Sequence, residues 1–278
     1  MKSILVALDN TPAAKSAGDV ALGLAQQHQA AVMALSVVDL DYLAPPEPVP
    51  LGGTAFKAAA DAARIERASR EIDKLLHEFE AKRQRHKLLG EALRINGAPL
   101  PALTRAATGH DLVVIGRDTS FHAVPSRETA LTVELLLKRN PRPVLVVPPL
   151  ESVNEMGSIL IAFDGSLAAA KALQIFALLD LAKKTKLRLL SIAPDEKEAQ
   201  DLVAEAAGYL ALYGISPERH GIVATADIAG TLLAETKRWK PDMLVMGAFG
   251  HRGWREALLG SCTKSLLRAC PTSLFIHH

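Results

Sequence analysis

The chain has 278 residues, of which 49% are hydrophobic and 22% are charged, a composition that excludes disordered and collagen-like classes and fits about two folded domains. The formal net charge of +2 does not favour nucleic acid as a partner. No apolar run approaches the roughly 20 residues that span a membrane, and the first run ends at Asp9 before a secretory leader could form, so we expect a cytoplasmic protein without a membrane partner.

Short apolar runs alternate with stretches of helical period through the first 150 residues. We predict strands at 3–8, 31–38, 87–93, 111–116 and 143–147. Apolar residues three and four apart predict helices at 11–28, 58–84, 99–108 and 126–139. Strand runs without polar alternation indicate parallel strands that are covered on both faces. The predicted fold class is therefore α/β, with three α/β/α layers and a mainly parallel sheet.

One connection in this half is longer than the others. The segment 39–55 contains four prolines and two glycines and separates a predicted strand from a predicted helix. Connections of this length are usually functional lids or mobile segments, and a solvated insertion is the alternative. The later part of the chain has no counterpart, because only a few residues around Pro194 separate strand from helix there.

The same pattern then occurs a second time. Residues 4–9 (ILVALD) return as 159–164 (ILIAFD), and residues 111–116 (DLVVIG) return as 242–247 (DMLVMG). In this second copy we predict strands at 158–163, 187–193, 218–224, 242–247 and 272–277. We predict its helices at 167–184, 196–213, 228–238 and 260–269. Each copy is five-stranded, and the polar stretch between them predicts tandem domains at 1–150 and 156–278.

A glycine-rich loop follows the predicted strand 242–247. Gly247, Gly250 and Gly260 precede Ser261 and a predicted helix, so the loop leaves the carboxyl end of a strand, where open α/β sheets bind ligands. Glycine lets the backbone approach an anion, and free N–H groups at a helix start favour negative charge. The segment predicts a phosphate site, and glycines that serve only the turn are the alternative. It is neither a Walker loop nor a dinucleotide fingerprint.

The spacing Gly247-x2-Gly250-x9-Gly260-Ser261, with Asp164 after the first strand of the same copy, resembles the ATP-binding pattern of the universal stress protein family. The double copy resembles the tandem members of that family, and the likeness covers both halves of the chain. It implies a sheet of strand order 3-2-1-4-5 in each domain. It also implies ATP as the ligand, with or without Mg²⁺.

The resemblance implies roles for individual residues of the second domain. Asp164 would hold the adenosine end of ATP, and the backbone of Ile192 would contact adenine. Around the ribose and phosphates it places Met246, Gly247, Gly250, Gly260, Ser261 and Cys262. The glycines and Ser261 match the family pattern directly, whereas Ile192 and Cys262 are placed by position alone. An Asp-Gly-Ser turn before a helix is also good N-cap chemistry, so capping is the alternative role of Asp164.

The first copy departs from this pattern. When Gly116 is aligned with Gly247, threonines replace the other two glycines, and Asp118 falls where a phosphate would lie. A carboxylate about 5 Å from a phosphate costs on the order of 3 kcal/mol at an effective dielectric near 20. We therefore expect the first domain to have kept the fold and lost the nucleotide site, although Arg117 leaves room for a smaller anion there.

These observations predict an ATP-binding stress-response or regulatory protein that holds its nucleotide in the second domain. No catalytic residue is predicted, because the loop supplies no general base, and the scattered histidines and two cysteines form no metal site. Slow ATP hydrolysis or autophosphorylation stays open, with Ser261 and Thr263 as the hydroxyls concerned. The alternatives are an adenine-nucleotide hydrolase-type enzyme that adenylates its substrate, and a nucleotide-free interaction scaffold.

The last strand of each copy has an edge that needs covering. In the family resembled, the fifth strands of two domains meet antiparallel, which implies an intrachain pseudo-dimer that joins 144–147 to 274–277 about an approximate two-fold axis. Association of two such chains into a homodimer and the identity of protein partners are left open.

Overall fold

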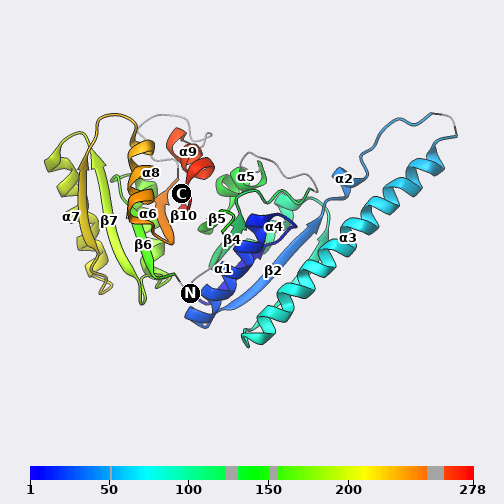
Figure 1. Ribbon diagram of the computed structural model, residues 1–278, viewed down its shortest axis with the longest axis horizontal. Helices are drawn as coiled ribbons and strands as arrows, with labels where there is room; N and C mark the ends of the chain where they lie inside the picture. Colours follow the sequence, from blue (N-terminus) through cyan, green and yellow to red (C-terminus); the bar gives the residue numbers. More distant parts are fainter. Residues whose placement is uncertain (51, 123–130, 151–155, 249–259) are drawn as a thin grey trace.

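The computed structural model describes residues 1–50, 52–122, 131–150, 156–248 and 260–278 of the chain. Strands and helices alternate along these residues, and Figure 1 shows the helices packed along an extended sheet. The strands of the first half are β1 (Ser3–Ala7), β2 (Ala31–Val38), β3 (Gly90–Asn96), β4 (Leu112–Gly116) and β5 (Val144–Val147). Those of the second half are β6 (Ser158–Ala162), β7 (Lys186–Ala193), β8 (Glu218–Val223), β9 (Met243–Gly247) and β10 (Ser273–His277).

The helices lie between these strands in chain order. Those of the first half are α1 (Pro12–His28), α2 (Leu40–Leu43), α3 (Thr54–Arg85), α4 (Pro99–Ala107) and α5 (Leu131–Arg139). Those of the second half are α6 (Leu167–Leu178), α7 (Glu196–Ala211), α8 (Ile228–Trp239) and α9 (Ser261–Ala269). The predicted α/β alternation is confirmed, and residues 126–130 of one predicted helix lie outside the described residues.

The strands form one ten-stranded sheet of order β3-β2-β1-β4-β5-β10-β9-β6-β7-β8. Neighbouring strands are parallel within each half, and both halves have the predicted order 3-2-1-4-5. At the centre β5 and β10 pair antiparallel, with Leu145 opposite Phe275. The two fifth strands therefore cover each other's edges, as the sequence led us to expect.

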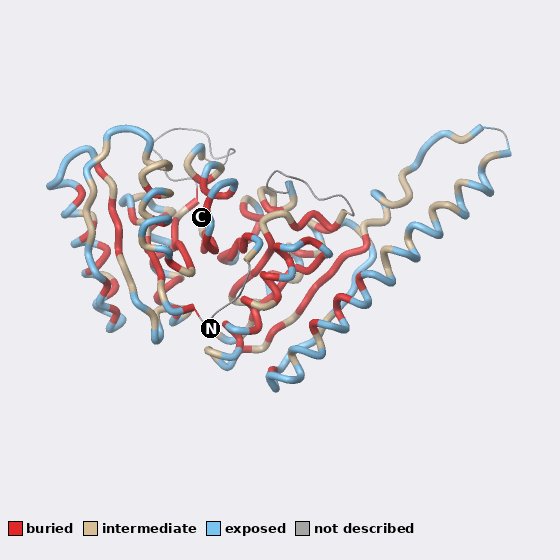
Figure 2. The backbone as a smooth tube through the Cα atoms, in the orientation of Figure 1, coloured by how far each residue is buried: buried red, intermediate tan, exposed pale blue. Residues whose placement is uncertain are grey.

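Two clusters of buried side chains cover the two faces of this sheet. On β1, Ile4 and Val6 belong to one cluster and Leu5 and Ala7 to the other, because successive side chains of a strand point to opposite faces. Figure 2 shows the resulting buried band through the central strands. Each half is thus a three-layer arrangement of helices, sheet and helices.

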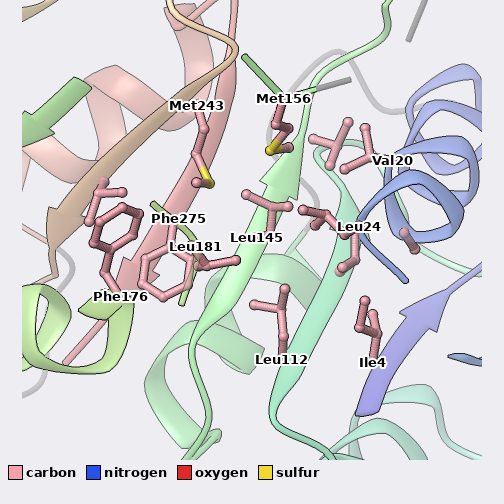
Figure 3. Close-up of a cluster of buried hydrophobic side chains, with 14 of the residues drawn as sticks. Ile4, Val20, Leu24, Leu112, Leu145, Met156, Phe176, Leu181, Met243 and Phe275 are labelled. Carbon is pink, nitrogen blue, oxygen red and sulfur yellow. The ribbon is translucent and has the colours of Figure 1, made fainter. Parts of the chain in front are cut away.

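The cluster that contains Ile4 is continuous across the two halves. Figure 3 shows Leu145 of β5 between Leu112 of β4 and Phe275 of β10. The rings of Phe275 and Phe176 meet edge to face with their centroids 6.4 Å apart, a favourable aromatic geometry. The halves therefore share apolar packing as well as strand hydrogen bonds.

The segment 39–55 is more regular than the sequence predicted. Asp39 caps α2 by accepting a hydrogen bond from the backbone N–H of Tyr42 at 3.2 Å. Helix α3 begins at Thr54, four residues earlier than expected, and its first turns project away from the sheet in Figure 1. Phe56 in these turns is 82% exposed, so burial of the later turns is what attaches α3 to the sheet.

Two element boundaries differ from the prediction for steric reasons. Strand β3 begins at Gly90, where a Cβ atom would lie 1.8 Å from the carbonyl oxygen of Val32, so the strand starts at the glycine that permits this approach. Helix α6 ends at Leu178 instead of 184, and Asp180 and Lys184 then adopt positive φ angles of 57° and 61° in the turn that follows.

The part of the chain that the structure describes contains no helix that is both long and apolar enough to cross a membrane. Among the same residues, no three or more His, Cys, Asp or Glu side chains are grouped so that they could hold a metal ion.

Candidate functional site

A cavity of about 860 Å³ lies at the carboxyl ends of β6, β7 and β9, in the second half of the chain. Six of the residues singled out from the sequence line it: Asp164, Ile192, Met246, Gly247, Gly260 and Cys262. Ser261, the first residue of α9, stands between two of them. Gly250 lies outside the described residues. The fold thus brings together positions that are up to about a hundred residues apart in the sequence.

Asp164 follows β6 and is exposed. Its Oδ1 accepts a hydrogen bond from the backbone N–H of Ser166 at 3.0 Å, and the Ser166 hydroxyl in turn accepts one from Ala169 N at 3.1 Å. Ser166 is therefore the N-cap of α6, and Asp164 supports the turn that precedes it. The capping role considered for Asp164 belongs to Ser166, which leaves the second carboxylate oxygen of Asp164 without a partner among the described residues.

The start of α9 differs from the start of the other helices of the second half. Helices α6, α7 and α8 are capped by the side chains of Ser166, Asp195 and Asp227. Helix α9 has Gly260 at its N-cap, and no side chain of the described residues caps it, while Cys262 and Thr263 of its first turn line the cavity. The first N–H groups of a helix have no partner within it, and they carry partial positive charge. This end of α9 can therefore donate to an anion in the cavity.

Gly247 and Gly260, the two glycines of the cavity wall that were singled out from the sequence, differ in how close their neighbours lie. A Cβ atom on Gly247 would lie 2.3 Å from the backbone N of Ala169, so glycine is needed there for the end of β9 to approach α6. Gly116 has the same relationship to Ala14 N, at 2.4 Å, in the first half. A Cβ on Gly260 would meet no atom of the described residues within 4 Å. Packing thus accounts for Gly247, whereas no described neighbour requires glycine at position 260.

The rest of the cavity wall is largely apolar. Ile192 of β7 and Met246 of β9 lie along it together with Ile228 and Leu232 of α8. Burial raises the pKa of the Cys262 thiol, and nearby carboxylates raise it further, so this thiol is protonated near neutral pH. Among the described residues that line the cavity none is lysine or arginine, so backbone N–H groups and the hydroxyls of serine and threonine are the donors that they offer to an anion.

Sequence reasoning missed the contribution of α8, together with Thr225 and Glu198. The signal was present, because Asp227 follows the third strand of the second half and ligand sites of such sheets gather at the carboxyl ends of several strands. Asp227 adopts a left-handed conformation with φ 48° and accepts a hydrogen bond from Gly230 N at 2.9 Å. This turn directs the start of α8 toward the cavity.

The corresponding place in the first half is closed by the chain itself. Asp9 is 5% exposed, and its Oδ2 accepts hydrogen bonds from the backbone N–H groups of Ser120 at 3.0 Å and Phe121 at 3.1 Å. Its Oδ1 accepts from the backbone and the hydroxyl of Thr11. Burial raises the pKa of Asp9 above its ordinary value, and these hydrogen bonds partly offset the rise. The N–H groups of the loop after β4 therefore bind the carboxylate that a ligand would need.

The structure also places Arg117, considered as an anion contact in the first half, elsewhere. Its Nη1 donates to the carbonyl oxygens of Cys270 at 3.0 Å and Arg268 at 3.3 Å, at the end of α9. Next to it, Oδ1 of Asp118 is buried and has no hydrogen-bond partner among the described residues. The Arg117 guanidinium is thus already bound to carbonyl oxygens, and its neighbour Asp118 would repel a phosphate.

Comparison with known proteins agrees with the fold. The family model described as the universal stress protein family matches residues 1–148 and 193–278. A solved universal stress protein from Archaeoglobus fulgidus is 18% identical, with a TM-score of 0.71 over 99% of this chain and 97% of its own. A functionally unknown protein from Pseudomonas aeruginosa is 16% identical, with a TM-score of 0.59 over 100% of this chain and 92% of its own. At these identities the likeness shows the fold.

A curated universal stress protein from Synechocystis is 26% identical over 160 residues, which are 57% of this chain and 54% of that protein. This chain therefore spans about half the length of the curated relative that it matches.

Proposed function

The chain belongs to the universal stress protein family, and from this premise we propose that it is a cytoplasmic, nucleotide-responsive regulatory protein of stress responses that binds one ATP in its second half. The observation that carries the proposal is the joint position of Asp164, Gly260 and the start of α9 on one cavity. A carboxylate, a glycine and the N–H groups of a helix start are complementary to a ribose and its phosphates.

Each part of ATP has a matching surface in this cavity. The apolar side chains of Ile192, Ile228 and Leu232 offer a wall for the adenine ring. The carboxylate oxygen of Asp164 that has no partner among the described residues can accept a hydrogen bond from a ribose hydroxyl. The N–H groups at the start of α9 can donate to phosphate oxygens. Mg²⁺ would enter with the phosphates, and we assign it no protein ligand.

We propose a single site per chain because the first half uses the equivalent groups internally. Ligand entry there would require Asp9 to exchange its bonds to Ser120 and Phe121 for bonds to the ligand. The buried N–H groups of the loop would then lose their acceptor, which costs about 1–3 kcal/mol for each group. The proposed domains are 1–150, with a degenerate site, and 156–278, with the nucleotide site.

Native mass spectrometry and calorimetric titration of the intact chain with ATP, with and without Mg²⁺, test this function. We expect one ATP per chain, and we expect Asp164→Ala to weaken binding by about 1.5–3 kcal/mol, the usual loss for a hydrogen bond to a charged group. Glu205→Ala, which removes an exposed carboxylate of α7, is the matched control and keeps full affinity. Absence of binding would favour the nucleotide-free scaffold, and two equivalents would contradict the closed first site. Release of ADP or an adenylated product would point to an enzyme.

A further inference from the structure

Arg117, in the first half of the chain, reaches a helix of the second half. Its Nη1 donates hydrogen bonds to the carbonyl oxygens of Cys270 and Arg268, at 3.0 and 3.3 Å, and lies 3.5 Å from that of Leu267. These carbonyls belong to the last turn and the C-cap of α9. The first half therefore binds one end of the helix whose other end lines the cavity.

The chemistry of a helix end explains why an arginine is suited to this contact. The last carbonyl groups of a helix have no partner within it, and the helix dipole makes this end partly negative. Cys270, the C-cap of α9, has φ −68° and ψ 126°, so the helix does not end in the left-handed residue that commonly satisfies such carbonyls. The planar guanidinium of Arg117 supplies both the positive charge and the donors that this end lacks.

The backbone of Arg117 is itself held in place. Its N–H donates to the carbonyl oxygen of Val147 at 2.8 Å, which ties it to the end of β5. A few residues later, Ser120 and Phe121 donate to the buried carboxylate of Asp9. The same loop that closes the first-half site thus presents the guanidinium to α9 from a fixed position.

The residue that corresponds to Arg117 in the second half does not make this contact. Ala248 is the residue of the second half that corresponds to Arg117. Its N–H donates to the carbonyl oxygen of His277 at 2.8 Å, as the N–H of Arg117 does to that of Val147. The backbone arrangement is therefore repeated, but a methyl group cannot reach the last turn of α5. Of these two corresponding residues, Arg117 is therefore the one whose side chain reaches the other half.

Helix α9 is short enough to move as one body. It has nine residues, about 13 Å at 1.5 Å per residue. Leu266 and Leu267 near its end are fully buried, and Figure 1 places the helix above β10, close to the junction of the two halves. Cys262 and Thr263, one to two turns earlier, line the cavity. A shift of the end that Arg117 holds would consequently shift the N–H groups at the start.

We propose that Arg117 is a positioning residue for nucleotide binding: by holding the carbonyl end of α9, it sets where the N–H groups of residues 261–263 meet the phosphates. This inference rests on the function proposed above. It gives the loop that closes the first-half site a role in the site of the second half, and it makes the two halves of the chain functionally unequal.

The test compares three variants of the intact chain by calorimetric titration with ATP, at a temperature well below the unfolding midpoint of each. Arg117→Met keeps an unbranched apolar stem but removes the charge and the donors, and Arg117→Lys keeps a cationic donor. Arg142→Met is the matched control, because Arg142 also donates to a backbone carbonyl, that of Thr108 at 2.9 Å, but within the first half. Amide hydrogen exchange of α9 without nucleotide is measured in parallel.

We expect Arg117→Met to weaken ATP binding about tenfold and to speed exchange of the α9 amides, while Arg117→Lys stays within about threefold of the parent and Arg142→Met is unchanged. Parent-like affinity of folded Arg117→Met would overturn the positioning role and leave the proposed function intact. Equal losses in Arg117→Met and Arg142→Met would also overturn it, because they would indicate a general effect of weakening the first half. If Arg117→Met does not fold, Arg117→Gln takes its place under the same criteria. Failure of the parent chain to bind ATP would overturn both proposals.

Discussion

Asp9 and Asp164 occupy equivalent positions, two residues after β1 and β6, but the first carboxylate is enclosed by its own half and the second is exposed. Asp9 is 5% exposed and accepts hydrogen bonds from Thr11, Ser120 and Phe121. Asp164 accepts one bond from Ser166 among the described residues. The same residue type therefore stabilises a distant loop in one half and is exposed, with one bond to its own turn, in the other.

Replacement of the two carboxylates should separate these roles. Asp9→Asn places an amide donor against N–H groups that need an acceptor, and we expect it to lower the free energy of unfolding by about 1–3 kcal/mol. Asp164→Asn changes an exposed group and should stay within about 0.5 kcal/mol of the parent. Urea unfolding followed by circular dichroism measures both. Equal effects of the two variants would show that the bonds around Asp9 contribute little.

The two glycines of the cavity should respond differently to a methyl group. Gly247→Ala forces a Cβ to within 2.3 Å of Ala169 N and should cost about 1–3 kcal/mol of stability. The methyl group of Gly260→Ala meets no atom of the described residues within 4 Å and should keep stability within about 0.5 kcal/mol, while at the start of α9 it weakens ATP binding. Thermal unfolding and titration of each variant distinguish the two effects. Unchanged ATP affinity in Gly260→Ala would exclude phosphate from that position.

The packing at the centre of the sheet should depend on Phe275. This side chain is fully buried on β10 against Phe176, and Phe275→Ala should cost about 3–5 kcal/mol of stability. Phe56→Ala is the matched control, because Phe56 is 82% exposed and its loss should change stability by less than about 0.5 kcal/mol. The urea midpoints of the two variants provide the comparison, and a small effect at Phe275 would mean that burial of this ring contributes little to the stability of the chain.

His277 should make the chain sensitive to mild acid. Burial lowers the pKa of His277 to about 4, and its buried Nδ1 has no hydrogen-bond partner in the described parts of the chain. The unfolded chain binds a proton at this residue near pH 6.5 and the folded chain does so only near pH 4, so its contribution to stability is present above pH 6.5 and is lost as the pH falls toward 4.

His277→Leu should therefore flatten the dependence of the unfolding midpoint on pH between 6.5 and 4. The exposed His77 of α3 supplies the control, and His77→Leu should keep the slope of the parent chain. Identical slopes in the parent chain and in His277→Leu would show that the folded protein accommodates a protonated His277.

Patterns within the sequence were enough to predict the fold class and the duplication. Apolar runs such as 112–115, and apolar residues at helical spacing such as those of 11–28, show which faces of each strand or helix will be buried. These patterns predict the elements because burial of apolar side chains is the main contribution to their stability. The glycine loop and the position of Asp164 also predicted where a ligand cavity lies, because carboxyl ends of parallel strands meet at one edge. The resemblance to a known family supplied the strand order and the expected ligand.

Tertiary structure alone decided what individual polar groups do. Whether Asp9 is free or enclosed depends on Ser120, 111 residues away, and the contact of Arg117 with Cys270 spans 153 residues. No local pattern encodes such pairs, because they form only when the sheet has brought distant loops together. The same holds for Gly247, whose need for a hydrogen side chain comes from the approach of α6. Local periodicity specifies which faces are buried, whereas the partners of loop residues are specified by the packing of the whole chain.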